Sequence, residues 1–474
     1  KELILQKNNL CNIATKILKF NGDGNTIWNY LNPGNEFWDY DTTLENLVKS
    51  KYYKAEDLDD MSNYPSTLIE AKKSYPVAFS AFGGLLYYLK ELKLDESIMT
   101  LANFKDYTMT SRNATTMILD GITLSNLELL NNSTDGSDKG TLFKLINRAI
   151  TLFGKRRLKS WILQPLVETS DINARYDAVD FLTTNGEFRD QIEKGLSDIP
   201  DLERLIARVH GKTLRFKDFV KVIEGFERIS RLSNILKSYE LKDAGILSSF
   251  IAAFPSNLDE SIGKWSDAFD RQQAVNDIVM PESGVDEEFD DSQTKMDDLE
   301  TQLNNHLRTY KREYKSQEIC YRDSGKEIYL IEVPVKIKNI PKEWQQMGAT
   351  SKVKRFWSPE VKKLVRQLME QRETHKILCE SLRNRMYEKF DIDYSTWLSA
   401  ITALADIDCI TAITKASETI GFPSCRPQPI ESENATVNFK EFRHPCLNGK
   451  EELIPKDITL GGNEANFGLL TGAN

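Results

Sequence analysis

The sequence predicts a mainly α, multidomain protein, and three observations support that fold class. The chain has 474 residues, which at about 150 residues per domain corresponds to about three domains. Apolar residues make up 40% and charged residues 28%, the ordinary composition of a folded chain with several cores. Beyond residue 140, apolar residues recur at spacings of three and four, the period of amphipathic helices.

The first hundred or so residues mix strand and helix patterns. A strand is expected at Lys1–Leu5 and an apolar helix from about Val77 to Leu89, so this part is predicted to be a small α/β domain. A wholly polar stretch from Asn131 to Gly140 then indicates a surface connection.

Amphipathic helices follow this connection. The first apolar stripe ends at Gln164-Pro165, because proline lacks the N–H that a continuing helix needs. Thr169 or Ser170 is expected to cap the next helix. Further helices are predicted over 202–209 and 216–229.

Two later stripes are longer, one from Met296 to Tyr314 and one from Val361 to Met386. About 30 helical residues span roughly 45 Å, so we expect an antiparallel pair that serves as a lever. Between the stripes the period changes to two over Glu327–Val333, preceded by the turn sequence Asp323-Ser324-Gly325. A small β module is therefore predicted at one end of the helix pair.

Charge is segregated along this predicted arm. The chain as a whole carries −9, which excludes a uniformly basic coat for nucleic acid. Residues 336–366 nevertheless hold nine basic and two acidic residues, whereas residues 286–300 hold eight acidic residues and one lysine. The basic run is either a solvated face or a sequence-independent grip on nucleic-acid phosphates. The candidate phosphate contacts are Lys336, Lys338, Lys342, Lys352, Lys354 and Arg355.

Several other kinds of site are not expected. The six cysteines form no C-x-x-C pair and the four histidines no H-E-x-x-H motif, so neither a zinc site nor a catalytic constellation is predicted. The longest nearly apolar run noted, Tyr75–Leu89, is shorter than the 18 or so residues that a membrane-spanning helix needs. We therefore expect no membrane partner.

The last residues suggest the start of a phosphate-binding loop. After a stiff linker from Pro423 to Pro429 and a strand at Thr436–Phe439, a buried strand is expected at Phe467–Thr471, followed by Gly472-Ala473-Asn474. A strand that runs into a glycine is how G-x-x-x-x-G-K-[ST] begins. The second Gly, the Lys and the Ser/Thr are not present, so this chain alone is not expected to hydrolyse ATP.

A series of motifs resembles the MutS family of DNA mismatch-repair ATPases. They occur in the family's order over essentially the whole chain: Gly140-Thr141-Leu142-Phe143, Gly154-Lys155-Arg156, Gln164-Pro165-Leu166, Pro200-Asp201-Leu202-Glu203-Arg204-Leu205, Arg443-His444-Pro445 and Leu470-Thr471-Gly472. Phe37-Trp38-Asp39, Lys354-Arg355-Phe356-Trp357 and Cys425-Arg426-Pro427 further resemble a eukaryotic mismatch-recognising branch of that family.

The resemblance implies a domain organisation. It comprises a connector (1–119), a first lever and core part (120–265), a clamp with long helices and a β tip (266–374), a returning lever and core part (375–433) and the start of an ABC-type ATPase domain (434–474). A mismatch-binding domain with a stacking Phe and a nearby Glu would precede Lys1. The clamp falls on the basic run, in agreement with the charge argument.

The resemblance also implies a function. The expected role is an ATP-dependent DNA clamp in mismatch recognition, in the nucleus, acting on double-stranded DNA with mismatches or small loops. Expected partners are a second MutS homologue, as a heterodimer, and downstream MutL-type proteins. ATP and Mg²⁺ are implied for the full-length protein, with none bound to this segment; the nucleotide-binding residues carried over are Leu453, Ile454, Gly472, Ala473 and Asn474.

Two other classes of protein remain open on the residues alone. A coiled-coil chromosome-organising ATPase also has long helices that lead to a phosphate-binding loop, but it requires heptads sustained over many turns. A non-enzymatic helical scaffold that binds only protein would show no salt-dependent affinity for DNA.

Overall fold

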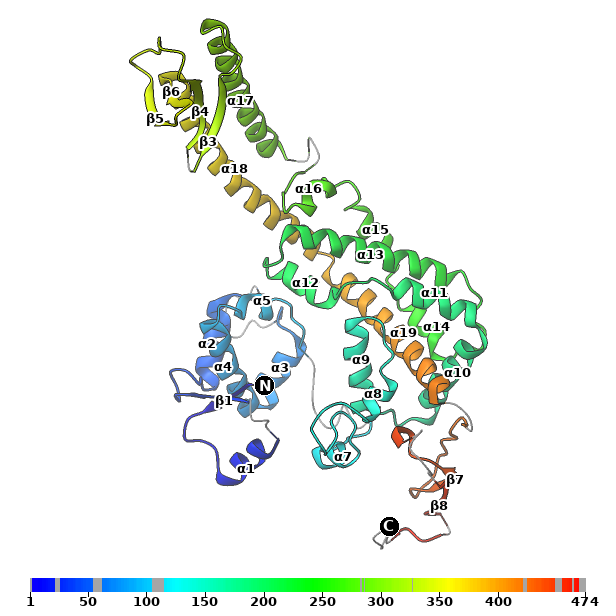
Figure 1. Ribbon diagram of the computed structural model, residues 1–474. Helices are drawn as coiled ribbons and strands as arrows, with labels where there is room; N and C mark the ends of the chain where they lie inside the picture. The colour runs from blue at the N-terminus through cyan, green and yellow to red at the C-terminus, as the bar shows by residue number, and fades with distance from the viewer. Residues whose placement is uncertain are drawn as a thin grey trace. The chain divides into compact units, whose positions relative to one another are not determined.

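The computed structural model describes residues 2–21, 26–53, 62–104, 115–281, 284, 286–325, 327–420, 424–447, 454–462 and 464–468. The predicted fold class is confirmed, because helices dominate these residues and the strands form only small sheets (Figure 1). The chain divides into two compact units. Unit 1 comprises Lys1–Leu214, Lys221–Glu260 and Asp393–Asn474, and unit 2 comprises Arg215–Val220 and Ser261–Ile392. The predicted domain boundaries stay a prediction.

Unit 1 contains most of the helices. Its elements are β1 (Glu2–Gln6), α1 (Asn12–Asn21), β2 (Ile27–Leu31), α2 (Tyr40–Ser50), α3 (Ser66–Ser74), α4 (Pro76–Glu91), α5 (Asp95–Met99), α7 (Gly121–Asn126), α8 (Leu142–Ile146), α9 (Leu152–Leu163), α10 (Thr169–Thr184), α11 (Gly186–Leu196), α12 (Leu202–His210), α14 (Ile246–Ala252), α19 (Tyr394–Ile420), β7 (Val437–Phe442), the 3₁₀ turn η1 (Pro445–Leu447) and β8 (Lys456–Leu460). Helices α13 (Phe216–Lys237) and α15 (Leu258–Gly263) have residues in both units.

Unit 2 contains two long helices and the largest sheet. Its elements are α16 (Arg271–Val275), α17 (Glu287–Glu313), β3 (Cys320–Ser324), β4 (Glu327–Pro334), β5 (Gln345–Ala349), β6 (Val353–Trp357) and α18 (Pro359–Asp391). The alternation over 327–333 and the two long stripes predict β4 and both long helices, whereas no strand is predicted at β3, β5 or β6.

The N-terminal part is α/β, as predicted. Strands β1 and β2 pair in parallel, and helices α2 to α5 enclose an aromatic core that includes the fully buried Phe79. Helix α4 comes close to α2 and to Phe37 just before α2, because a Cβ added to Gly83 would meet the Thr43 hydroxyl at 1.9 Å and one added to Gly84 would meet the Phe37 ring at 2.6 Å. These two glycines therefore permit the close packing.

Helix α19 forms the centre of unit 1, although the sequence analysis does not single it out. It is long and apolar enough to cross a membrane by length and composition, yet 78% of its most apolar window is buried inside the protein. Trp397 is fully buried and its ring lies 4.6 Å from that of Phe226. A helix that is apolar on every side is typical of a core helix surrounded by others.

A buried carboxylate joins α19 to α9. Asp408 has no exposed surface, and it accepts hydrogen bonds from the amides of Ile150 (3.0 Å) and Thr151 (2.8 Å) and from the Thr151 hydroxyl (2.7 Å). The same hydroxyl accepts from the Gly154 amide at 3.0 Å and so caps α9. Burial raises the pKa of Asp408, while these bonds oppose that shift.

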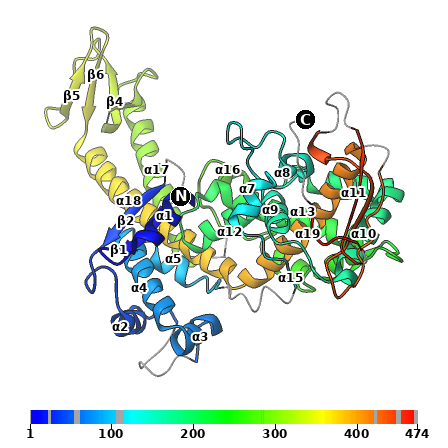
Figure 2. The ribbon, with the colours of Figure 1, turned by 90° about the horizontal axis from the view of Figure 1, so that it is seen from below.

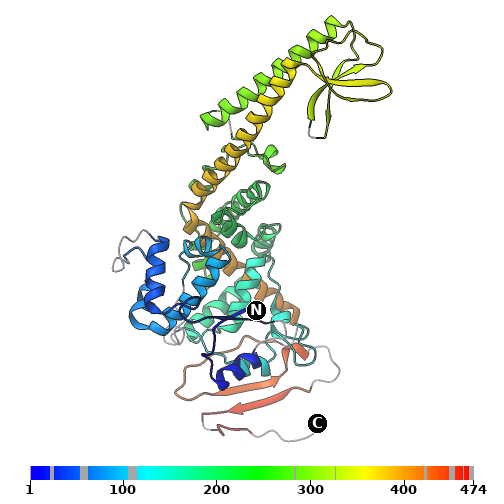
Figure 3. The ribbon, with the colours of Figure 1, turned by 90° about the vertical axis from the view of Figure 1, so that its left-hand side faces the viewer.

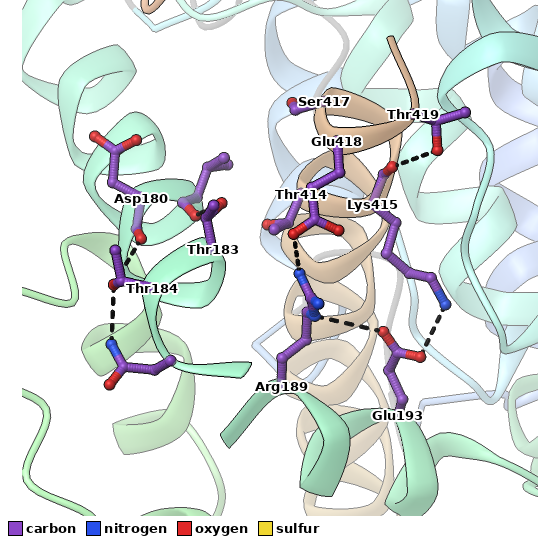
Figure 4. Close-up of polar contacts among 12 residues, drawn as sticks. Asp180, Thr183, Thr184, Arg189, Glu193, Thr414, Lys415, Ser417, Glu418 and Thr419 are labelled. Atoms are coloured by element: carbon purple, nitrogen blue, oxygen red, sulfur yellow. Dashed lines mark hydrogen bonds and ion pairs between the residues drawn. The ribbon is translucent and has the colours of Figure 1, made fainter. Parts of the chain in front are cut away.

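Ion pairs hold the neighbouring helices. Arg156 donates to Asp201 and Glu203, and Arg157 pairs with Asp406 of α19. At the C-terminal end of α19, Arg189 contacts Glu418, and Lys415 lies 2.8 Å from Glu193 (Figure 4). These contacts fix α9 and α11 against the central helix.

Two local predictions are wrong. Neither Thr169 nor Ser170 caps α10: Glu168 occupies the N-cap position without a side-chain bond, and the Thr169 hydroxyl, already inside the helix, donates to Glu431 at 3.0 Å. Phe467 is 76% exposed and not in a strand, so the predicted buried strand does not begin there. Residues 469–471 of that strand lie outside the described residues.

The contact of Asp408 with the Thr151 cap leaves no room for a side chain at Gly154. A Cβ at position 154 would lie 2.1 Å from Asp408 Oδ2, whereas a Cβ at Gly186 would meet nothing within 4 Å. We expect Gly154→Ala to lower the free energy of unfolding by about 3 kcal/mol, since overpacking here also breaks the cap. Gly186→Ala, the matched control, should change it by less than about 1 kcal/mol. Urea unfolding measures both, and equal effects would contradict the role of Gly154.

Candidate nucleic-acid interface

Helices α17 and α18 form an antiparallel pair, as predicted (Figure 3). The contacts between them run in opposite directions along the two helices: the Tyr310 and Ser358 hydroxyls lie 2.7 Å apart, Arg372 donates to Glu300 at 2.8 Å, and Arg385 donates to Asp286 at 2.7 Å. Both helices also pack on the sheet in one apolar core, which includes the fully buried residues Leu303, Ile331, Val361 and Leu368.

A polar layer interrupts the contact between the two helices. The Ser292 hydroxyl lies 3.0 Å from His375 Nδ1 and accepts from the Gln371 amide at 3.0 Å, and the Phe289 ring packs on the imidazole at 4.9 Å. Burial lowers the pKa of His375, because the charged imidazolium would lose solvation there.

The sheet is antiparallel, with strand order β3-β4-β6-β5 (Figure 2). In the central pair, Ile331 lies opposite Phe356 and Val333 opposite Lys354. The amide of Val335 donates to the Lys352 carbonyl at 3.0 Å, so the segment after β4 lies beside the turn between β5 and β6. This brings residues far apart in the sequence to one end of the sheet.

Four of the six candidate phosphate contacts gather at that end. Lys336 and Lys338 follow β4, Lys352 occupies the β5–β6 turn, and Lys354 is the second residue of β6, opposite Val333. Lys336, Lys338 and Lys352 are exposed and Lys354 is half-buried. Among the described residues, Lys338, Lys352 and Lys354 have no ion-pair partner, so their charge is available to a polyanion.

The other two candidates are placed differently. Lys342 is exposed, but it lies close in the chain to Trp344, whose ring packs on Tyr310 and Tyr314 near the end of α17. Arg355 is half-buried and its Nε lies 3.0 Å from Glu332 directly across the sheet. Arg355 therefore stabilises the β4–β6 pair, and its charge is already matched.

The acidic stretch does not neutralise the basic end of the sheet. Within residues 286–300, Asp286 pairs with Arg385 and Glu300 with Arg372, both on α18. The carboxylates that do reach candidate residues are Glu318, 2.8 Å from Lys336, and Glu332. The segregation of charge in the sequence thus persists in the folded unit.

The structure describes only one of the nucleotide-binding candidates. Ile454 is 70% exposed, just before β8. Leu453, Gly472, Ala473 and Asn474 lie outside the described residues.

The segment between α19 and β7 is fastened to α10. Arg426 lies 2.8 Å from Asp177 and 2.7 Å from Asp180, and its guanidinium is 5.4 Å from the centre of the Tyr176 ring. With the Thr169–Glu431 bond, this gives the segment two attachments to one helix. Proline spacing predicts a stiff linker here, whereas nothing in the spacing indicates this anchor.

The comparisons with known proteins give the family. A family model described as MutS domain III matches residues 122–414, and the chain therefore belongs to the MutS family. Over its whole length it resembles MSH6: it is 45% identical to the DNA mismatch repair protein MSH6 of Saccharomyces cerevisiae over 100% of this chain and 39% of that protein.

More distant relatives agree. The DNA mismatch repair protein MSH6 of Arabidopsis thaliana is 31% identical over 95% of this chain and 38% of the relative, and Msh6 of Homo sapiens is 27% identical over 98% and 39%. The chain thus spans about two fifths of the length of these relatives. The resemblance predicted from the motifs is confirmed, and the coiled-coil alternative is set aside.

The polar layer makes the stability of unit 2 depend on pH. Because the pKa of His375 is lower in the folded state, its neutral form contributes stability above the unfolded value of about 6.5, and this contribution is lost as the pH falls. We expect stability to fall less steeply below about pH 6.5 in His375→Gln, by only a fraction of the about 1.4 kcal/mol per pH unit that one proton can give, because solvent screens the partly exposed imidazole. Urea unfolding at a series of pH values measures it, and identical slopes in both proteins would contradict the assignment.

Proposed function

We propose that this chain is the DNA-gripping and signal-transmitting part of a mismatch-recognition ATPase. The observation that carries the proposal is the cluster Lys336, Lys338, Lys352 and Lys354 at one end of the sheet, in a chain of net charge −9. Ammonium groups at such an end reach phosphate oxygens without reading bases, so the grip is independent of sequence and sensitive to salt.

Helices α17 and α18 suit the transmission of a signal. Their apolar core and the ion pairs Arg372–Glu300 and Arg385–Asp286 hold them as one rigid element. A rigid lever converts a small shift at one end into a larger displacement at the other. In the whole protein, ATP and Mg²⁺ at the phosphate-binding loop would bias the lever between gripping DNA at a mismatch and sliding along it.

The names of the relatives support the wider setting. They are DNA mismatch repair proteins, so we propose double-stranded DNA with mismatches or small loops as the ligand, the nucleus as the location, and a second MutS homologue and MutL-type proteins as partners. Base-specific recognition of the mismatch would belong to another part of the protein, since the lysine cluster offers no base readout.

Charge reversal at the sheet end tests the grip. The double variant Lys338→Glu/Lys352→Glu should weaken binding to matched and mismatched duplex alike and flatten the log–log salt dependence by up to about 0.9 per lost phosphate contact. Titrations of duplex DNA at several salt concentrations measure this slope.

The control changes charge by the same amount elsewhere on the unit. Lys376 and Lys389 are exposed on α18, away from the sheet, and Lys376→Glu/Lys389→Glu should leave the slope close to that of the unaltered chain. Equal slopes in the two double variants would refute the backbone grip.

A further inference from the structure

A groove of about 560 Å³ lies along the first turns of α18, in unit 2. Trp357, Pro359 and Met369 contribute to its apolar wall, and Lys362, Lys363 and Arg366 also line it. None of these residues is among the candidate phosphate contacts. The volume is within the range of ligand-binding pockets. The apolar wall and the cations together favour a ligand that carries both an apolar group and negative charge.

The Trp357 and Met369 side chains present apolar surface to a ligand. The one polar atom of the Trp357 side chain, Nε1, already donates to the Ile328 carbonyl at 3.1 Å, so its ring contributes only apolar surface to the groove. Met369 is 49% exposed, although its neighbour Leu368 is fully buried in the core. A methionine at an exposed position adapts its shape to different apolar side chains.

The charges of the groove are not balanced by the protein. Lys363 has no ion-pair partner among the described residues, and Lys362 is bonded to the neutral Gln345 amide oxygen at 2.7 Å. Arg366 lies 3.0 Å from Glu370, but both side chains are largely exposed, at 82% and 65%, and such a pair is easily exchanged. Three cations against one carboxylate favour an acidic ligand.

We propose that this groove docks an acidic protein segment that presents one aromatic or aliphatic side chain. That side chain would pack on Trp357 and Met369, while neighbouring carboxylates pair with Lys362, Lys363 and Arg366. Duplex DNA supplies negative charge, but its phosphate backbone has no apolar group to fill the wall, so the groove fits a peptide better than a nucleic acid. This docking is independent of the proposed grip on DNA.

A labelled peptide tests the proposal on the full chain. The probe is a short peptide of Asp and Glu around a central Phe-Leu pair, compared with the same peptide carrying Ser-Ser at the centre, and binding is read by fluorescence anisotropy. We expect the Phe-Leu peptide to bind at least about tenfold more tightly than the Ser-Ser peptide. Met369→Gln should remove most of this difference without changing the charge.

A matched variant on the same helix controls for folding. Ile377 is 62% exposed on α18 and does not line the groove, so Ile377→Gln should leave peptide binding unchanged. Lys363→Glu should weaken the binding of both acidic peptides. Lys338→Glu/Lys352→Glu should weaken DNA binding yet spare the Phe-Leu peptide, which separates this proposal from the grip on DNA.

Three outcomes would overturn the docking proposal. The first is no binding of the Phe-Leu peptide. The second is equal binding of the Phe-Leu and Ser-Ser peptides, which would mean that the groove attracts any polyanion. The third is a loss of DNA affinity in Met369→Gln as large as the loss of peptide affinity, which would identify a nucleic acid as the occupant.

Discussion

One apolar core, shared by α17, α18 and the four-stranded sheet, determines what unit 2 presents to its surroundings. Leu303, Ile331, Val361 and Leu368 are fully buried in it, and Phe356 of β6 and Trp344, which directly precedes β5, are buried with them. Because these side chains occupy the interior, the lysines that follow β4 and begin β6 are left at the end of the sheet, where water solvates them. The hydrophobic effect thus places the cations, and no charge–charge attraction is needed to hold them there.

Two carboxylates of the acidic stretch 286–300 pair with arginines of α18. Its first and last carboxylates, Asp286 and Glu300, meet arginines of α18, so opposite charges that are neighbours in the sequence do not meet at the sheet. A clamp for a polyanion needs this separation, since acidic side chains beside the lysines would cancel the attraction. Arg355 is an example of a cation that is not available, because Glu332 on the neighbouring strand neutralises its charge.

The spacing of apolar residues predicted those helices and strands that have one apolar and one polar face. The stripes 296–314 and 361–386 gave both long helices, and the alternation over 327–333 gave β4. Helix α19 was not predicted, because it is apolar on every side and so shows no amphipathic stripe. The role of Asp408 was not predicted either, because its hydrogen-bond partners Ile150 and Thr151 are far away in the sequence. Strand β5 contains Gly348 and two glutamines, and β6 reads as part of a basic run, so neither shows strand alternation. The basic run is visible in the composition. Only the register of β4 and β6 shows that Arg355 is paired with Glu332, whereas Lys354 lies opposite the uncharged Val333.

The Ser292–Gln371–His375 layer has a consequence for the length of the arm. Two helices that pack only through leucine side chains can be aligned in several ways along their axes, because one apolar contact replaces another at little cost. A hydrogen-bonded trio has one alignment, and a slip of a single turn, about 5.4 Å, would break the hydrogen bonds that Ser292 makes with Gln371 and His375. The contacts between α17 and α18 therefore fix the alignment of the two helices along their common axis, and so the length of the pair.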